Sequence, residues 1–186
     1  MSWPQRSREF RDNIPVTLGI GERLGCRQFN ALYGNRVDHQ DPNAQDDLAA
    51  ENLALAAIAA ASIDGTVLLE PVSGAERYPL LTAFQALEVI DRVERESGQQ
   101  LGLLADLYHL AVNGDDADKV IEAQVDRIAH VQIADAPGRN EPGSGDLPLM
   151  RQLEDLYSGG YTGWVGLEYK PSTRTQDSFG WLPQGS

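Results

Sequence analysis

The sequence contains one cysteine, Cys26, only three histidines and no cluster of basic residues. A single cysteine excludes an internal disulfide framework and a zinc site built from several thiolates. The formal net charge is −13. Because phosphate recognition needs clustered lysine and arginine, this charge argues against a nucleic-acid partner. A solvated acidic surface explains the charge without any partner.

Long apolar runs are also missing. No stretch approaches the roughly 20 apolar residues of a membrane-spanning helix, and the N-terminal segment MSWPQRSREFRDN lacks the apolar core of a signal peptide. We therefore expect a cytoplasmic protein without a membrane partner. Hydrophobic residues make up 41% of the 186 residues, enough for a sizeable core. No linker divides the chain, so a single domain over residues 1–186 is predicted.

Predicted strands and helices alternate along the chain. The strand-like runs are Arg27–Leu32, Thr66–Glu70, Leu101–Asp106, Ile128–Ile133 and Trp164–Glu168. Helical patterns cover about 3–24, 44–61, 82–98, 115–125 and 148–157, with one short helix expected near SFGWL in the C-terminal tail. Such alternation predicts parallel strands with helices packed outside them. No G-x-G-x-x-G follows a strand, so a barrel is favoured over a doubly wound nucleotide-binding sheet.

Four of these strand-like runs end on or near oxygen-bearing side chains. They close on Glu70, on Asp106, on Gln132 followed by Asp135, and on Glu168. The interval is 36 residues from Glu70 to Asp106, 26 from Asp106 to Gln132 and 36 from Gln132 to Glu168. These intervals are close to the roughly 30 residues of a βα unit. The side chains therefore fall at the same point of successive units. In parallel α/β folds that point is the C-terminal edge of the strands, where active sites lie.

Three carboxylates around one cavity repel each other unless a cation lies among them or one is protonated. Together with the amide oxygen of Gln132 they form an all-oxygen donor set, which suits Mg²⁺ or Mn²⁺ rather than zinc. In the alternative interpretation, some of them are strand-end residues paired with lysine or arginine. A divalent cation beside two glutamates would suit proton abstraction next to a carbonyl group, through an enediolate.

Two further residues are candidates for substrate contacts. His109 could polarise a substrate oxygen or transfer a proton, or it could cap a backbone carbonyl at a helix start. Arg139, in the loop DAPGRNEPGSG, could hold a carboxylate or polyol through paired hydrogen bonds. It could equally pair with Glu141 or Asp135. His130, inside a strand, is expected to be a packed core residue.

The segments LLEP, LLADLYHLAVNGDD, AHVQIADAPGRNEPGSG and GWVGLEYKP resemble the hydroxypyruvate isomerase family, which belongs to the xylose-isomerase-like TIM barrels. The resemblance extends from about Phe10 to Leu182 and implies a (β/α)8 barrel. The superfamily also includes endonuclease IV, but a multi-zinc site of that type needs many histidines. The family usually reads EPIN or EPVN after the first glutamate, whereas this chain has EPVS with Ser73.

The resemblance implies a complete set of site residues. Glu70 and Glu168 would be the catalytic acid/base pair and would also hold the metal. The remaining metal ligands would be Asp106 and Gln132, and the substrate contacts would be His109 and Arg139. The implied reaction converts hydroxypyruvate to tartronate semialdehyde. The alternatives are a related isomerase or epimerase of a sugar or oxo-tetronate, and a non-catalytic fragment that acts in binding or assembly.

The chain is short for this family. A TIM barrel takes about 250 residues, and only five strands are predicted here. We therefore expect an incomplete barrel that lacks the first two βα units. An incomplete parallel barrel exposes strand edges and part of its core. The two hypotheses are a truncated product and a homo-oligomer in which a second copy closes the gap.

Overall fold

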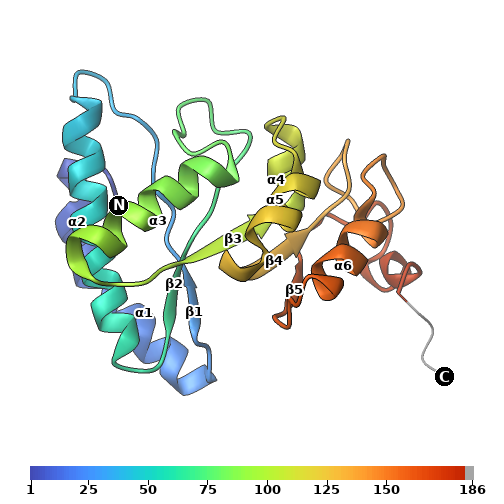
Figure 1. The fold of residues 1–186 in the computed structure, drawn as a ribbon, viewed down its shortest axis with the longest axis horizontal. Coiled ribbons are helices and arrows are strands. Elements are labelled where there is room, and N and C mark those ends of the chain that lie inside the picture. Colours follow the sequence, from blue (N-terminus) through green and yellow to red (C-terminus); the bar gives the residue numbers. More distant parts are fainter. Residues whose placement is uncertain (183–186) are drawn as a thin grey trace. The chain divides into compact units, whose positions relative to one another are not determined.

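The computed structural model describes residues 1–182, in which strands and helices follow one another along the chain (Figure 1). This part of the chain forms two compact units, Met1–Leu104 and the residues from Ala105 onward. The expected single domain stays a prediction, and so do the hypotheses of truncation and of a second copy.

The first unit contains three helices and the strands that they accompany. In chain order its elements are η1 (Pro4–Arg6), α1 (Ser7–Leu24), β1 (Gln28–Asn30), α2 (Pro42–Ala61), β2 (Thr66–Leu69), α3 (Ala83–Ser97) and the first part of β3 (Gly102–Asp106). β1 pairs with β2, and β2 with β3, both in parallel. Helix α2 packs against β2 and contacts α1 and α3. Parallel strands with intervening helices confirm the α/β prediction.

Local sequence signals explain where these helices begin and end. Asp41 caps α2 by accepting from the Asn43 N–H, and Pro42 occupies the first helical turn. Thr82 caps α3 in a reciprocal capping box with Gln85, as its sequence position predicts. Helix α3 ends at Gly98, whose φ of 71° is the left-handed conformation that glycine adopts at little cost.

The second unit begins at the end of β3. Its elements are α4 (Leu107–Val112), α5 (Ala117–Gln124), η2 (Val125–Arg127), β4 (Ile128–Ile133), α6 (Leu149–Ser158), β5 (Val165–Leu167) and η3 (Thr175–Phe179). β4 and β5 are parallel, with Gln132 opposite Gly166. Helix α4 packs against β4, and α5 packs against α6. Val131 and Ile133 of β4 are fully buried, as expected for a strand covered by helices.

The predicted strands and helices occur in the predicted order, but several boundaries differ. The first and last strands are only three residues long, shorter than Arg27–Leu32 and Trp164–Glu168. Helix α4 was not predicted. It forms because the Asp106 side chain caps it directly after β3, without an intervening loop. The short helix expected near SFGWL lies a few residues earlier, and residues 183–186 of the predicted tail loop lie outside the described part. No helix in residues 1–182 is both long and apolar enough to span a membrane.

Candidate functional site

Asp106 is the last residue of β3 and is completely buried. Its Oδ1 atom accepts hydrogen bonds from the backbone N–H groups of Tyr108 (2.9 Å) and His109 (3.3 Å). Its Oδ2 atom lies 3.5 Å from Nη2 of Arg139 and 3.6 Å from Nε2 of His109. Burial raises the pKa of Asp106, while the backbone hydrogen bonds and the Arg139 charge oppose this shift. The structure thus supplies the cation that a buried strand-end carboxylate requires.

Arg139 connects two of the predicted site carboxylates. Its Nη2 atom lies 2.6 Å from Oε1 of Glu168, which directly follows β5, as well as 3.5 Å from Asp106. Its Nε atom donates to the Glu168 carbonyl oxygen (3.3 Å), and its guanidinium carbon lies 5.2 Å from the centre of the Tyr108 ring. The Arg139 backbone is left-handed, with φ 56°, which is uncommon for a residue other than glycine. Such a conformation persists when the surrounding structure imposes it, and it is frequent at binding sites.

The alternative prediction, in which Arg139 pairs with Glu141 or Asp135, is wrong. The Glu141 carboxylate accepts from the backbone N–H and the hydroxyl group of Ser172. The Asp135 carboxylate accepts from three backbone N–H groups of its own loop. Arg139 is therefore directed to the strand ends and not to the acidic residues nearest to it in the sequence.

His109 lies in α4 and is 5% exposed. Burial lowers its pKa to about 4; the Arg139 charge acts in the same direction, and Glu168 opposes it. The imidazole ring is therefore neutral near pH 7. A neutral ring offers one nitrogen donor and one nitrogen acceptor, which allows a hydrogen bond to a substrate oxygen.

Gln132 and His130 project from the same face of β4, since side chains two residues apart in a strand share a face. The Oε1 atom of Gln132 and the Nδ1 atom of His130 are buried, and neither has a hydrogen-bond partner within residues 1–182. Opposite them is Gly166, where a Cβ atom would lie 3.1 Å from His130 Nε2 and 3.3 Å from Gln132 Cγ. Burial lowers the pKa of His130. His130 as a whole is half-buried, so its role as a packed core residue stays a prediction.

Glu70 belongs to the first unit, where it follows β2 and is 5% exposed. Its Oε2 atom accepts a hydrogen bond from Nδ2 of Asn30, the last residue of β1 (2.6 Å). Asn30 was not singled out from the sequence. The signal was present, because RQFNAL is also a strand-like run that contains a polar residue near its end. The hydroxyl group of Tyr78 donates to the Glu70 carbonyl oxygen, and burial raises the pKa of Tyr78 to about 12, with the Glu70 charge adding to the shift.

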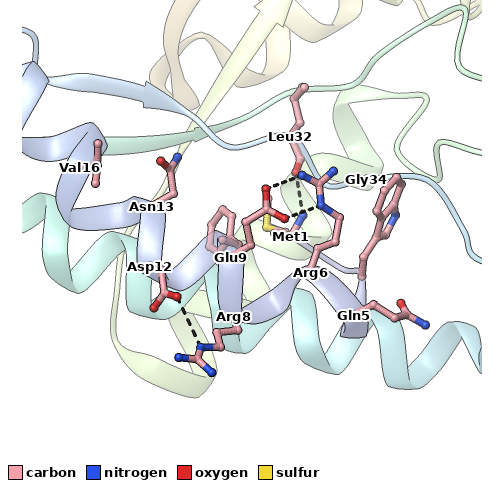
Figure 2. A pocket seen from close by; sticks show the side chains of 12 residues that line it. Met1, Gln5, Arg6, Arg8, Glu9, Asp12, Asn13, Val16, Leu32 and Gly34 are labelled. Carbon is pink, nitrogen blue, oxygen red and sulfur yellow. Dashed lines mark hydrogen bonds and ion pairs between the residues drawn. The ribbon is translucent and has the colours of Figure 1, made fainter.

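An open groove of about 950 Å³ lies elsewhere on the first unit, along α1. Figure 2 shows Arg6 and Glu9 on its wall, where the Arg6 Nε atom donates to Glu9 at 2.7 Å. None of the predicted site residues lines this groove. Its charged side chains pair with one another, so it offers no chemistry comparable to the strand ends.

The fold and the comparisons together define the class of this protein. The family model of the xylose isomerase-like TIM barrel matches residues 2–184, so the chain belongs to that family. A complete barrel of this type has eight strands, whereas residues 1–182 contain five. The predicted fold class, an incomplete barrel of parallel strands with helices, is confirmed.

The relatives indicate the kind of enzyme. The chain is 50% identical to a putative hydroxypyruvate isomerase from Streptomyces coelicolor, over 98% of this chain and 67% of that protein. It is 31% identical to the hydroxypyruvate isomerase of Escherichia coli, over 96% and 69%, and 27% identical to a 2-oxo-tetronate isomerase from Pectobacterium atrosepticum, over 96% and 68%. These relatives confirm the expected enzyme class, an isomerase. The chain spans about two thirds of their length.

Solved structures agree on the fold. A crystal structure described as an AP endonuclease of family 2 from Brucella melitensis matches with a TM-score of 0.88 and 32% identity, over 97% of this chain and 69% of that one. The similarity supports the assignment of the chain to this family.

Proposed function

We propose that the chain is a metal-assisted aldose–ketose isomerase that converts hydroxypyruvate to tartronate semialdehyde. The observation that carries the proposal is the position of Arg139, which lies between the carboxylates of Asp106 and Glu168 at the ends of two strands. An arginine at such a place can hold the carboxylate of a small oxo acid next to acid/base groups. The 50% identity to a putative hydroxypyruvate isomerase supports this substrate.

The proposed metal ligands are Glu70, Asp106, Gln132 and Glu168. All four offer oxygen atoms, which favours Mg²⁺ or Mn²⁺. The buried Oε1 atom of Gln132 lacks a partner among the described residues, and such an atom costs free energy unless a ligand satisfies it. The donor set therefore fits a divalent cation. Glu70 is assigned to it from the family resemblance, because the other three ligands belong to the second unit. A bound cation would polarise the substrate carbonyl group and offset negative charge on the enediolate oxygens.

The chain's own groups have separable roles in this proposal. The isomerisation moves one proton from C3 to C2 of hydroxypyruvate and another between the two adjacent oxygens. Glu70 and Glu168 remove and return the carbon-bound proton. His109, neutral near pH 7, hydrogen-bonds a substrate oxygen. The bonds of Arg139 within the described residues use Nε and Nη2, which leaves the Nη1 amino group for the substrate carboxylate.

A 2-oxo-tetronate is the second candidate substrate, since one relative that bears this name is 27% identical. Both substrates carry a carboxylate beside a carbonyl group, so Arg139 would serve either of them. The two are distinguished by comparing kcat/KM for the two acids. A purely non-catalytic role in binding or assembly would give no turnover of either.

The proposal is tested by following the isomerisation of hydroxypyruvate by proton NMR with added Mg²⁺ or Mn²⁺. We expect turnover that Glu168→Gln lowers about a thousandfold, because the amide cannot act as a base. Glu154→Gln, on the exposed face of α6, is the matched control and should retain full activity. Absence of turnover in the wild-type chain with either metal and either acid would refute catalysis. Absence of metal binding by calorimetry would refute the ligand set.

A further inference from the structure

We propose that Asp135 is a positioning residue that holds Arg139 at the site. The inference rests on the proposed role of Arg139 in substrate binding and extends it to the loop that carries this arginine. Asp135 lies two residues beyond β4 and is completely buried, although it contacts none of the proposed metal ligands through its carboxylate bonds. Its burial therefore calls for a separate explanation.

The Asp135 carboxylate closes the loop that follows β4. Its Oδ1 atom accepts from the N–H groups of Ala136 (2.9 Å) and Leu147 (3.0 Å). Its Oδ2 atom accepts from the N–H of Gly143 (2.8 Å). One side chain thus fastens three points of a loop that spans twelve residues. Both oxygens of a carboxylate accept hydrogen bonds. An asparagine of the same length would turn an N–H₂ group toward one of these N–H donors.

Arg139 lies within this closed loop. The backbone N–H of Asp135 donates to the Asn140 carbonyl oxygen at 2.9 Å, next to Arg139. On the other side, the Lys170 N–H donates to the Arg139 carbonyl oxygen at 2.8 Å, which ties the loop to the segment after β5. These two anchors hold Arg139 in its left-handed conformation, with φ 56°. The Asp135 carboxylate keeps the loop closed around the first of these anchors. When its bonds to the loop backbone are weakened, the guanidinium group loses its fixed position over Glu168.

A close backbone approach shows how tightly the loop is closed. A Cβ atom on Gly145 would lie 2.3 Å from the Ala136 carbonyl oxygen and 2.7 Å from Oδ1 of Asp135. Gly145→Ala therefore disturbs the same closure from the opposite side without removing the carboxylate. It serves as a second, independent variant if Asp135→Asn does not fold.

The experiment compares Asp135→Asn and Gly145→Ala with wild-type protein, using the NMR signal of the Arg139 Nε–H group, assigned by its loss in Arg139→Ala. We expect the signal to shift or broaden in both variants. For the acid substrate we expect KM to rise about tenfold, because a displacement of about 1 Å can cost that much or more. Asp116→Ala, which removes the side-chain cap of α5, is a control for a general loss of stability and should leave both readouts unchanged.

A double variant separates positioning from a merely structural role. In an Arg139→Ala background, Asp135→Asn should raise KM no further, because the group that it positions is already absent. A full additional tenfold increase there, or an Arg139 signal identical in wild type, Asp135→Asn and Gly145→Ala, would overturn the inference. The NMR readout needs no turnover. An inactive wild-type chain would therefore refute the proposed function, while the position of Arg139 would still be decided by its signal.

Discussion

Replacing Arg139 by alanine should destabilise the metal-free protein, and the size of the effect follows from the burial of its two partners. Asp106 is completely buried, whereas the Glu168 side chain is 46% exposed. The exposed pair with Glu168 contributes about 0.5 kcal/mol. The contact between Arg139 and Asp106 is long, at 3.5 Å, and Asp106 keeps its two backbone N–H bonds in the variant. Loss of this contact therefore costs about 1 kcal/mol, below the usual range for a hydrogen bond to a charged group. The total is about 1.5 kcal/mol, which corresponds to a fall in Tm of about 3–6 °C for a chain of this length.

The assay is thermal unfolding followed by circular dichroism, in chelator and again with saturating Mn²⁺. Arg151→Ala is the matched control, because Arg151 also bridges two carboxylates, Asp118 at 2.6 Å and Asp155 at 3.0 Å, but all three side chains are about half exposed. The control should lose less than about 1 kcal/mol. With Mn²⁺ present, the deficit of Arg139→Ala should shrink, because a cation at the proposed metal site would offset the charge of the same carboxylates. Equal losses in the two variants in chelator, or a deficit that Mn²⁺ does not reduce, would refute this reasoning.

Two further predictions concern the first unit and the tyrosines. Gly21→Ala, inside α1, should lower the unfolding free energy by about 1–3 kcal/mol, because the added Cβ would lie 2.5 Å from the Phe29 ring; a denaturant midpoint equal to that of the wild type would contradict this. Burial raises the pKa of Tyr78 and Tyr161 to about 12 and that of Tyr33 further. These phenols ionise more readily in the unfolded chain, so stability should be retained below about pH 10 and fall as the pH rises towards 12. Unfolding curves at pH 9 to 11.5 measure this, and a Tm that does not decline across that range would count against it.

Much of the local structure is readable from the sequence because its causes are local. The capping box of Thr82 with Gln85 marks the start of α3 and the left-handed Gly98 marks its end, and each signal lies within a few residues of the boundary that it sets. The intervals between Glu70, Asp106 and Glu168 indicate repeated βα units before any contact is known. Helix α4 is not predicted from the sequence, because Asp106 has two functions. The sequence pattern indicates a site carboxylate at Asp106. Its second function, capping the helix that follows, uses the other oxygen of the same side chain.

The pairing of Arg139 could not be obtained from the sequence. Glu141 and Asp135 are its near neighbours along the chain, yet Ser172 and the loop backbone take up their carboxylates. Arg139 instead contacts Glu168, 29 residues away, and Asp106, 33 residues away.

The sequence by itself determined the kind of fold, the order of its elements and the residue types available at the strand ends, because periodicity, caps and turn residues act over a few positions. Only the tertiary structure decided which acidic side chains face a cation, which are occupied by backbone N–H groups, and which polar atoms, such as Oε1 of Gln132, are buried without a partner among the described residues. These outcomes depend on the distances between strands and loops far apart in the chain. A carboxylate is the same residue type in all of these roles, and its surroundings in the folded protein decide between them.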